Sequence, residues 1–304
     1  MSGQTEGLGP SDSARSAHRL ALDERTGLLA PEQATRFGAR WFQPDPAIAD
    51  VVDRFWSTSW QFPSGESYRQ RIIATPLINL TIESGDVPGR FVITGVYRNV
   101  WDRRLTGVGA AFGIRLAPAG LAVLSDLAPQ DVADRTVVLT PESDHRLHAF
   151  LTALSEGLDV IDPSTFEEFV RRSTTALAGA LRERPVTSEG LLANHAVAEL
   201  AADQRIRSGD QPTGPQLADA LGTSERSIQR ALKATVGHGP KWISRRARLQ
   251  AVALALSVLP RVSIAQVAAE LGYADQSHLI NDFRLVVGAT PGDYVRSLRP
   301  LHTD

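Results

Sequence analysis

Three polar side chains in the C-terminal third of the chain are spaced so that they could act together. Arg226, Gln229 and Arg230 lie at positions i, i+3 and i+4, which share one face of an α-helix. Arginine suits the O6 and N7 atoms of guanine, and glutamine suits adenine, with about 1–3 kcal/mol of base discrimination for each good pair. This face therefore has the chemistry needed to read DNA bases, and an ordinary solvated helix face is the alternative.

These side chains belong to a unit that the chain contains twice. The first copy covers residues 216–243 and the second covers residues 266–295. The copies are offset by fifty residues up to a shared turn glycine and by fifty-one after it. Each copy has the pattern of a short helix, a turn with glycine and a second helix, which is typical of a helix-turn-helix. Two copies in register make this prediction much stronger than a single match would.

Local signals predict where these helices begin and end. Gly222 and Gly272 follow the first helix of each copy, where helices commonly stop. Ser224 and Asp275 precede the second helix and are good N-cap residues. The apolar residues that we expect to face inward on the two second helices are Ile228, Ala231, Leu232, Leu279 and Phe283.

The segments SERSIQRALK…VGHGPKWISRRARL and SIAQVAAELGYADQSHLINDFR…VGATPGDYV resemble the AraC/XylS family of bacterial transcription regulators. The resemblance covers about a third of the chain, from 191 to 299. It implies a DNA-binding domain over residues 190–300. Within it, helix-turn-helix units are expected at 215–236 and 263–287, joined by a long helix at 240–259.

The register of this resemblance assigns two sets of DNA contacts. The expected base-reading residues are Arg226, Gln229, Arg230, Gln276, Ser277, Ile280 and Asn281. The expected phosphate contacts, which need cations and helix N-termini, are Ser224, Ser227, Lys233, Lys241, Arg245 and Arg284. Asn281 stands where family members often carry a basic residue, and Ile280 has no hydrogen-bonding group, so the first unit should supply most of the base specificity. Arg246 and Arg248 are expected to be surface charges.

The charge distribution supports a nucleic-acid partner for the C-terminal region. The chain of 304 residues has a net charge of −2, but residues 190–300 carry thirteen Lys and Arg against nine Asp and Glu. A basic region on an otherwise acidic chain is typical of a domain that contacts phosphate. The lack of cysteine agrees with a reducing cytoplasm. The chain has neither a secretory signal pattern nor an apolar run of about 20 residues, so we expect a cytoplasmic protein without a membrane span.

The first two thirds of the chain have a different pattern of apolar and polar residues. Residues 1–35 are predicted to be a flexible tail and residues 36–143 a β-rich sensor domain, because apolar residues alternate with small or polar ones along 78–83 and 108–116. The predicted fold class is α+β, with a β-barrel or sandwich and flanking helices before an all-α domain. The β-rich part resembles the cupin-like domain that often precedes an AraC-type module.

Two amphipathic helices are predicted within residues 144–184, followed by a linker at 185–189. In the resembled family, helices at this place connect the sensor to the DNA-binding domain and often form dimers. The alternative is that they pack on their own barrel. Both a monomer and a homodimer remain open.

Five aromatic residues are candidates for an apolar effector pocket, with plain core packing as the alternative: Trp56, Trp60, Tyr97, Trp101 and Phe112. Residues 37–139 contain no histidine and the chain shows no nucleotide-binding loop, so neither catalytic residues nor a metal or other cofactor are predicted. The expected partner is double-stranded promoter or operator DNA, and RNA polymerase and a small-molecule effector are further candidates. The alternative functions are a ligand-independent module that binds DNA nonspecifically or binds protein, and, less favoured, a metal-dependent enzyme in the barrel.

Overall fold

The computed structural model describes residues 28–29, 37–202, 206, 209, 211–258 and 263–298. Its N-terminal part is built from strands, which are β1 (Leu28–Leu29), β2 (Phe37–Phe42), β3 (Val52–Gln61), β4 (Ser67–Ile72), β5 (Asn79–Gly85), β6 (Phe91–Thr94), β7 (Trp101–Thr106), β8 (Val108–Leu116) and β9 (Thr136–Val138). The predicted tail lies outside the described residues, except that its Leu28 and Leu29 form β1 and pair with β4.

The strands form two antiparallel sheets. One has the order β1-β4-β7 and the other the order β2-β3-β8-β5-β6-β9. The helices that follow are α1 (Gly120–Leu124), α2 (His145–Ser155), α3 (Phe166–Glu183), α4 (Ser188–Leu200), α6 (Gly214–Ala220), α7 (Glu225–Thr235), α8 (Pro240–Val258), α9 (Ile264–Glu270), α10 (Gln276–Val287) and α11 (Pro291–Ser297). The predicted α+β class, with a β-rich part before an all-α part, is confirmed.

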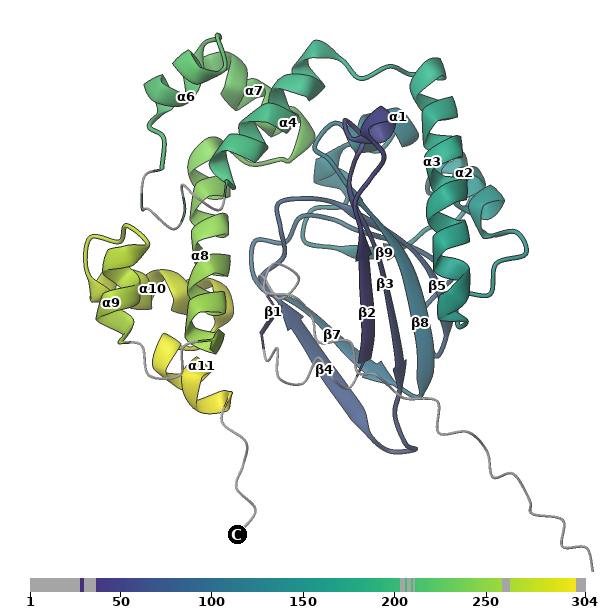
Figure 1. Cartoon of the computed structure of the whole chain (residues 1–304), viewed down its shortest axis with the longest axis horizontal. Helices are drawn as coiled ribbons and strands as arrows, with labels where there is room; N and C mark the ends of the chain where they lie inside the picture. Colours follow the sequence, from purple (N-terminus) through teal and green to yellow (C-terminus); the bar gives the residue numbers. More distant parts are fainter. Residues whose placement is uncertain are drawn as a thin grey trace, which may run out of the picture.

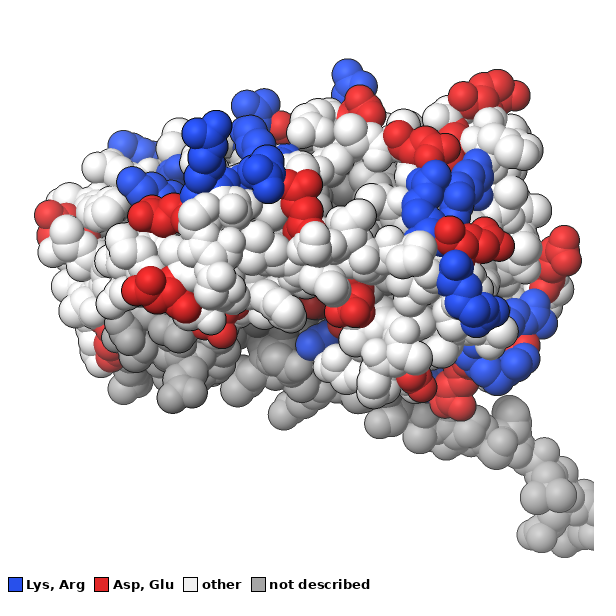
Figure 2. Space-filling view, turned by 90° about the horizontal axis from the view of Figure 1, so that it is seen from above, with Lys and Arg blue, Asp and Glu red and all other residues white. Residues whose placement is uncertain are grey.

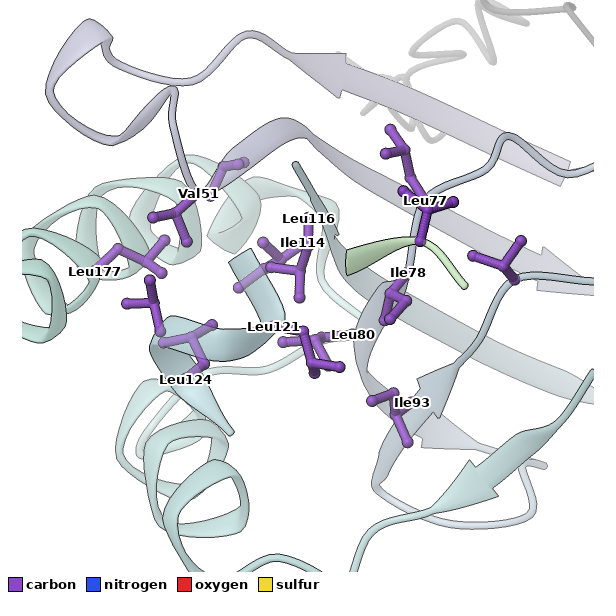
Figure 3. Packing of buried hydrophobic residues seen from close by; sticks show 14 of the residues in the cluster. Val51, Leu77, Ile78, Leu80, Ile93, Ile114, Leu116, Leu121, Leu124 and Leu177 are labelled. Atoms are coloured by element: carbon purple, nitrogen blue, oxygen red, sulfur yellow. The ribbon is translucent and has the colours of Figure 1, made fainter. Parts of the chain in front are cut away.

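One face of the six-stranded sheet packs against helices α1, α2 and α3 (Figure 1). Strand residues point alternately to the two sides of a sheet, and on this side they are apolar. Phe112 of β8 lies 5.2 Å from Phe166 and 5.3 Å from Phe169 of α3, measured between ring centroids. Figure 3 shows part of this cluster, including Ile78, Leu80, Ile93, Ile114, Leu116, Leu121 and Leu124. The apolar face of α3 is therefore occupied by the chain's own sheet.

The C-terminal part consists of two helix pairs held by one long helix. Helix α8 lies beside the β-rich part and is crossed by α10, while α6 and α7 lie beyond its N-terminal end (Figure 1). Helix α4 begins at Ser188, inside the predicted linker, and packs against α7 and α8. None of the described helices is both long and apolar enough to cross a membrane.

The local signals for the two second helices are confirmed. Ser224 caps α7 by accepting a hydrogen bond from the Ser227 amide at 3.1 Å, and Asp275 caps α10 by accepting one from the His278 amide at 2.7 Å. All five residues predicted to face inward on these helices are buried. The turn glycines Gly222 and Gly272 have positive φ angles of 60° and 70°, which favour glycine.

Candidate nucleic-acid interface and sensor cavity

The first predicted reading helix, α7, carries a polar face opposite its buried side. Arg226, Gln229 and Arg230 are exposed, while Ile228 between them is only 1% exposed. Arg230 donates through Nε to the Glu189 Oε1 atom of α4 at 2.9 Å, and its side chain remains 70% exposed. The geometry thus brings the three predicted base-reading groups of α7 to one accessible face.

The second predicted reading helix, α10, has a weaker set of groups. Gln276, Ser277 and Asn281 are exposed, but Ile280 is half-buried and contributes partly to packing. The Asn281 side-chain oxygen accepts a hydrogen bond from Arg284 at 3.2 Å. Arg284, a predicted phosphate contact, is exposed beside it.

The other predicted phosphate contacts differ in how freely they face solvent. Ser224 is exposed, and its hydroxyl lies 2.9 Å from that of Ser227, which is half-buried. Lys233 and Lys241 are exposed. In Figure 2, Lys and Arg side chains form one group at the left of the view, over the C-terminal helices, and a second group at the right, on the side of the molecule that carries α2 and α3.

Arg245 has a structural partner that the sequence did not indicate. Its Nε donates to the carboxylate of Asp282, a residue of α10 that is 9% exposed. The same carboxylate accepts a hydrogen bond from the Tyr273 hydroxyl at 3.1 Å. Burial, with the nearby Asp282 charge, raises the pKa of Tyr273, so this hydroxyl stays a donor. The ion pair of Arg245 with Asp282 therefore connects α8 to α10.

Arg246 is not the surface charge that we expected. It is 2% exposed, and its guanidinium donates to the backbone oxygens of Ala74 at 2.9 Å and Asn99 at 2.8 Å. It also donates to the backbone oxygens of Tyr97 and Arg98. Burial lowers the pKa of Arg246 to about 10, so it remains charged at neutral pH. Carbonyl groups from the β-rich part thus hold this arginine of α8.

A cavity of about 170 Å³ lies between the two sheets. Of the five aromatic candidates for an effector pocket, Trp56, Trp60 and Trp101 line this cavity, and Tyr97 and Phe112 do not. Phe112 belongs to the opposite side of β8, against α3. The Tyr97 hydroxyl lies 3.0 Å from that of Thr136, outside the cavity.

Glycines of β8 explain how large rings fit into this space. Trp60 and Trp56 of β3 pair across the strands with Gly109 and Gly113. A Cβ atom at Gly109 would lie 2.3 Å from the Trp60 ring, and one at Gly113 would lie 2.1 Å from the Trp56 ring. The alternation of these glycines with Phe112 was the sequence signal that separates the cavity side of β8 from the helix side.

The cavity wall also contains charged residues that the sequence did not single out. Glu83 of β5, 3% exposed, accepts two hydrogen bonds of 2.8 Å from Arg103 of β7, which joins the two sheets. Arg115 pairs with Asp53 at 2.6 Å. Among the described residues, no group of three or more His, Cys, Asp or Glu could hold a metal ion.

Two family models match separate parts of the chain. Residues 217–297, which include both helix-turn-helix units, match the family described as Helix-turn-helix domain, and residues 40–138 match a domain of unknown function, DUF6597. No curated protein matches the chain.

Solved structures similar to this chain include AraT and ToxT. The C-terminal domain of AraT, a response regulator from Geobacillus stearothermophilus, is 20% identical, with 39% of this chain and 95% of that chain covered and a TM-score of 0.34. ToxT from Vibrio cholerae O395 is 12% identical, with 88% of this chain and 99% of that chain covered and a TM-score of 0.38.

Proposed function

From a C-terminal region that is an AraC-type helix-turn-helix domain, we propose that the chain is a sequence-specific transcription regulator. It inserts α7 and α10 into adjacent segments of the DNA major groove, roughly one turn of about 34 Å apart. The observation that carries this proposal is the exposed face of α7, with Arg226, Gln229 and Arg230, beside a second unit of the same build. A monomer offers both helices, and a repeated operator would recruit a second copy.

The two helices have unequal roles in this proposal. The contact between Arg230 Nε and Glu189 does not outweigh base reading, because an exposed ion pair contributes only about 0–1 kcal/mol, less than the 1–3 kcal/mol of a good base contact. Helix α7 therefore reads most of the sequence. Helix α10, with half-buried Ile280, mainly positions the domain.

The test is selection of genomic DNA fragments by the purified full chain and by the Arg226→Ala/Arg230→Ala variant. The matched control, Arg171→Ala/Arg182→Ala, removes the same charge from exposed positions on α3. We expect a defined motif that the first variant loses and the control keeps. Binding without a motif, with a steep salt dependence, would instead favour the nonspecific DNA-binding alternative.

We also propose that a small molecule in the cavity between the sheets regulates DNA binding in the cytoplasm. Residues of both sheets line the cavity, which is rich in aromatic side chains, as ligand sites commonly are. The residues proposed for this site are Trp56, Trp60 and Trp101, now joined by Trp41. RNA polymerase remains a candidate partner of the DNA-bound protein.

A further inference from the structure

The wall of the sensor cavity includes a residue of the DNA-binding domain. Gln250 of α8 lines the cavity, is 5% exposed, and donates through Nε2 to the backbone oxygen of Ile73 at 2.7 Å. Ile73, Ala74 and Thr75 line the same cavity. One helical turn before Gln250, Arg246 donates to the Ala74 oxygen. The segment that borders the cavity is therefore also the segment that holds α8.

The size and walls of the cavity favour a single flat ring. Four of the five tryptophans of the chain line it, namely Trp41, Trp56, Trp60 and Trp101. The Trp41 and Trp56 rings lie 6.2 Å apart with an interplanar angle of 42°. An apolar cavity of about 150 Å³ accepts benzene in another protein, so 170 Å³ accommodates one substituted ring.

Two polar groups of the wall lack a hydrogen-bond partner within the described structure. They are the indole N–H of Trp41 and the hydroxyl of Thr58, whose polar atoms are buried. The other three cavity tryptophans each donate to an oxygen at 3.0 Å. Leaving a buried donor unpaired is unfavourable, so binding would favour a ligand whose acceptor atom reaches one of these groups as the wall adjusts around it.

The charges around the cavity disfavour an ionic ligand. Glu83 is satisfied by Arg103 through two hydrogen bonds, and Arg115 is paired with Asp53. A charged ligand would lose its hydration without meeting an unpaired opposite charge. A neutral ligand avoids this cost.

We propose, as a refinement of the proposed regulatory function, that the cavity binds a neutral one-ring aromatic molecule with a hydrogen-bond acceptor, and that Gln250 transmits its presence to α8. Occupation of the cavity alters the contacts of Gln250 and of residues 73–75. Because α8 joins the two helix-turn-helix units, this changes how α7 and α10 are presented to DNA. Coupling of this kind is reciprocal, and its usual size is about 5- to 150-fold in affinity.

The ligand class is tested with one set of matched probes and the full chain, by calorimetry and tryptophan fluorescence, without DNA. Acetophenone is the neutral aromatic probe with an acceptor. Benzoate and benzylammonium change the charge, ethylbenzene removes the acceptor, and acetylcyclohexane removes the aromatic ring. We expect acetophenone to bind at least about ten times more tightly than each of the others. Equal or tighter binding of any other probe, or no binding of acetophenone, would overturn the proposed class.

Variants show whether the probe occupies this cavity. Thr58→Val and Trp41→Phe each remove one unpaired hydrogen-bonding group and should weaken acetophenone binding about three- to tenfold. Trp242→Phe is the control, because Trp242 lies outside this cavity. Thermal unfolding checks that each variant is folded. If Trp41→Phe does not fold, the smaller change Thr58→Val still tests the site. Unchanged affinity in the folded cavity variants would contradict this site.

The coupling is measured as the ratio of the DNA dissociation constants with and without saturating acetophenone. At saturation this ratio does not depend on the affinity for the probe. In the natural chain, we expect saturating acetophenone to change the DNA dissociation constant by about fivefold or more. In Gln250→Ala, we expect it to change this constant by less than about twofold. Gln266→Ala, an exposed glutamine of α9, is the control. A ratio unchanged by Gln250→Ala would overturn the role of Gln250. Probe binding without any DNA binding would overturn the regulator function and leave the ligand class standing.

Discussion

The two helix-turn-helix units share a sequence pattern, but they are held in the molecule by different chemistry. At the position where α7 has the buried Ala231, α10 has the buried carboxylate of Asp282, with Arg245 and Tyr273 as its partners. The first unit touches α4 through the exposed pair of Arg230 and Glu189.

The C-terminal end of α10 is instead bonded to the β-rich part. The Val286 oxygen accepts from the Val100 amide at 3.3 Å, and the Val287 oxygen accepts from Arg71 at 2.7 Å. The first unit shares a buried apolar core with the β-rich part, which includes Ile228 and Leu232 of α7, and its hydrogen bond to that part is a longer contact of 3.4 Å from Gln130 to the Lys233 oxygen. The first unit is thus held mainly by apolar packing, and the second also by hydrogen bonds to the β-rich part, which is the difference that the proposed roles of the two units rest on.

The largest expected effect, on the stability of the fold, comes from replacing the buried carboxylate of the second unit with the alanine that the first unit has at the same position. Asp282→Ala leaves Arg245 and Tyr273 without their shared partner, and breaking a buried pair commonly costs about 3–5 kcal/mol. Because Arg245 is 38% exposed, we expect a loss of about 2–3 kcal/mol in the free energy of unfolding by denaturant. The exposed Asp219→Ala in the first unit should stay within about 0.5 kcal/mol. Equal effects of the two variants would remove the distinction between the units.

The next largest effect concerns base reading. Arg230→Ala should weaken binding to the selected DNA motif by about 1–3 kcal/mol and relax the preference at one base position. Asn281→Ala, the matched change on α10, should cost under about 1 kcal/mol, because its side chain is already paired with Arg284. Fluorescence anisotropy with motif and mutated DNA measures both. A larger loss for Asn281→Ala would reverse the proposed roles.

A smaller effect is expected from removing one hydrogen bond between the second unit and the β-rich part. Arg71→Ala removes the hydrogen bond to the Val287 oxygen, which contributes about 1 kcal/mol. Hydrogen exchange should become faster in the last turn of α10 and stay unchanged in α7. The control is Arg69→Ala on the same strand, which pairs with Asp102 and not with α10. Faster exchange in both units would mean that they are not attached differently.

The smallest effect is expected for the exposed pair in the first unit. Glu189→Ala releases Arg230 and should tighten DNA binding by at most about 1 kcal/mol, with a gain that shrinks at higher salt. Glu156→Ala, an exposed acidic residue that no part of the DNA-binding domain pairs with in the described structure, controls for net charge. Weaker DNA binding in Glu189→Ala would show that Glu189 supports Arg230 in its reading position.

Sequence alone determined the features that depend on neighbours along the chain. The caps of α7 and α10, their turn glycines and their buried stripes follow from helix spacing and from local hydrogen bonds, which act over three or four residues. The two sides of β8 also follow from alternation along the strand, which places Phe112 on the helix side, away from the cavity.

Tertiary structure alone decided what meets across the fold. Glu83 and Arg103 come from different sheets, and Arg246 finds its carbonyl partners about 150 residues earlier in the chain. An arginine that will be buried has the same local signature as one on the surface, because its burial depends on which distant backbone oxygens surround it. For the same reason no local pattern indicated that Gln250, in the helix that links the two DNA-binding units, would form part of the sensor cavity.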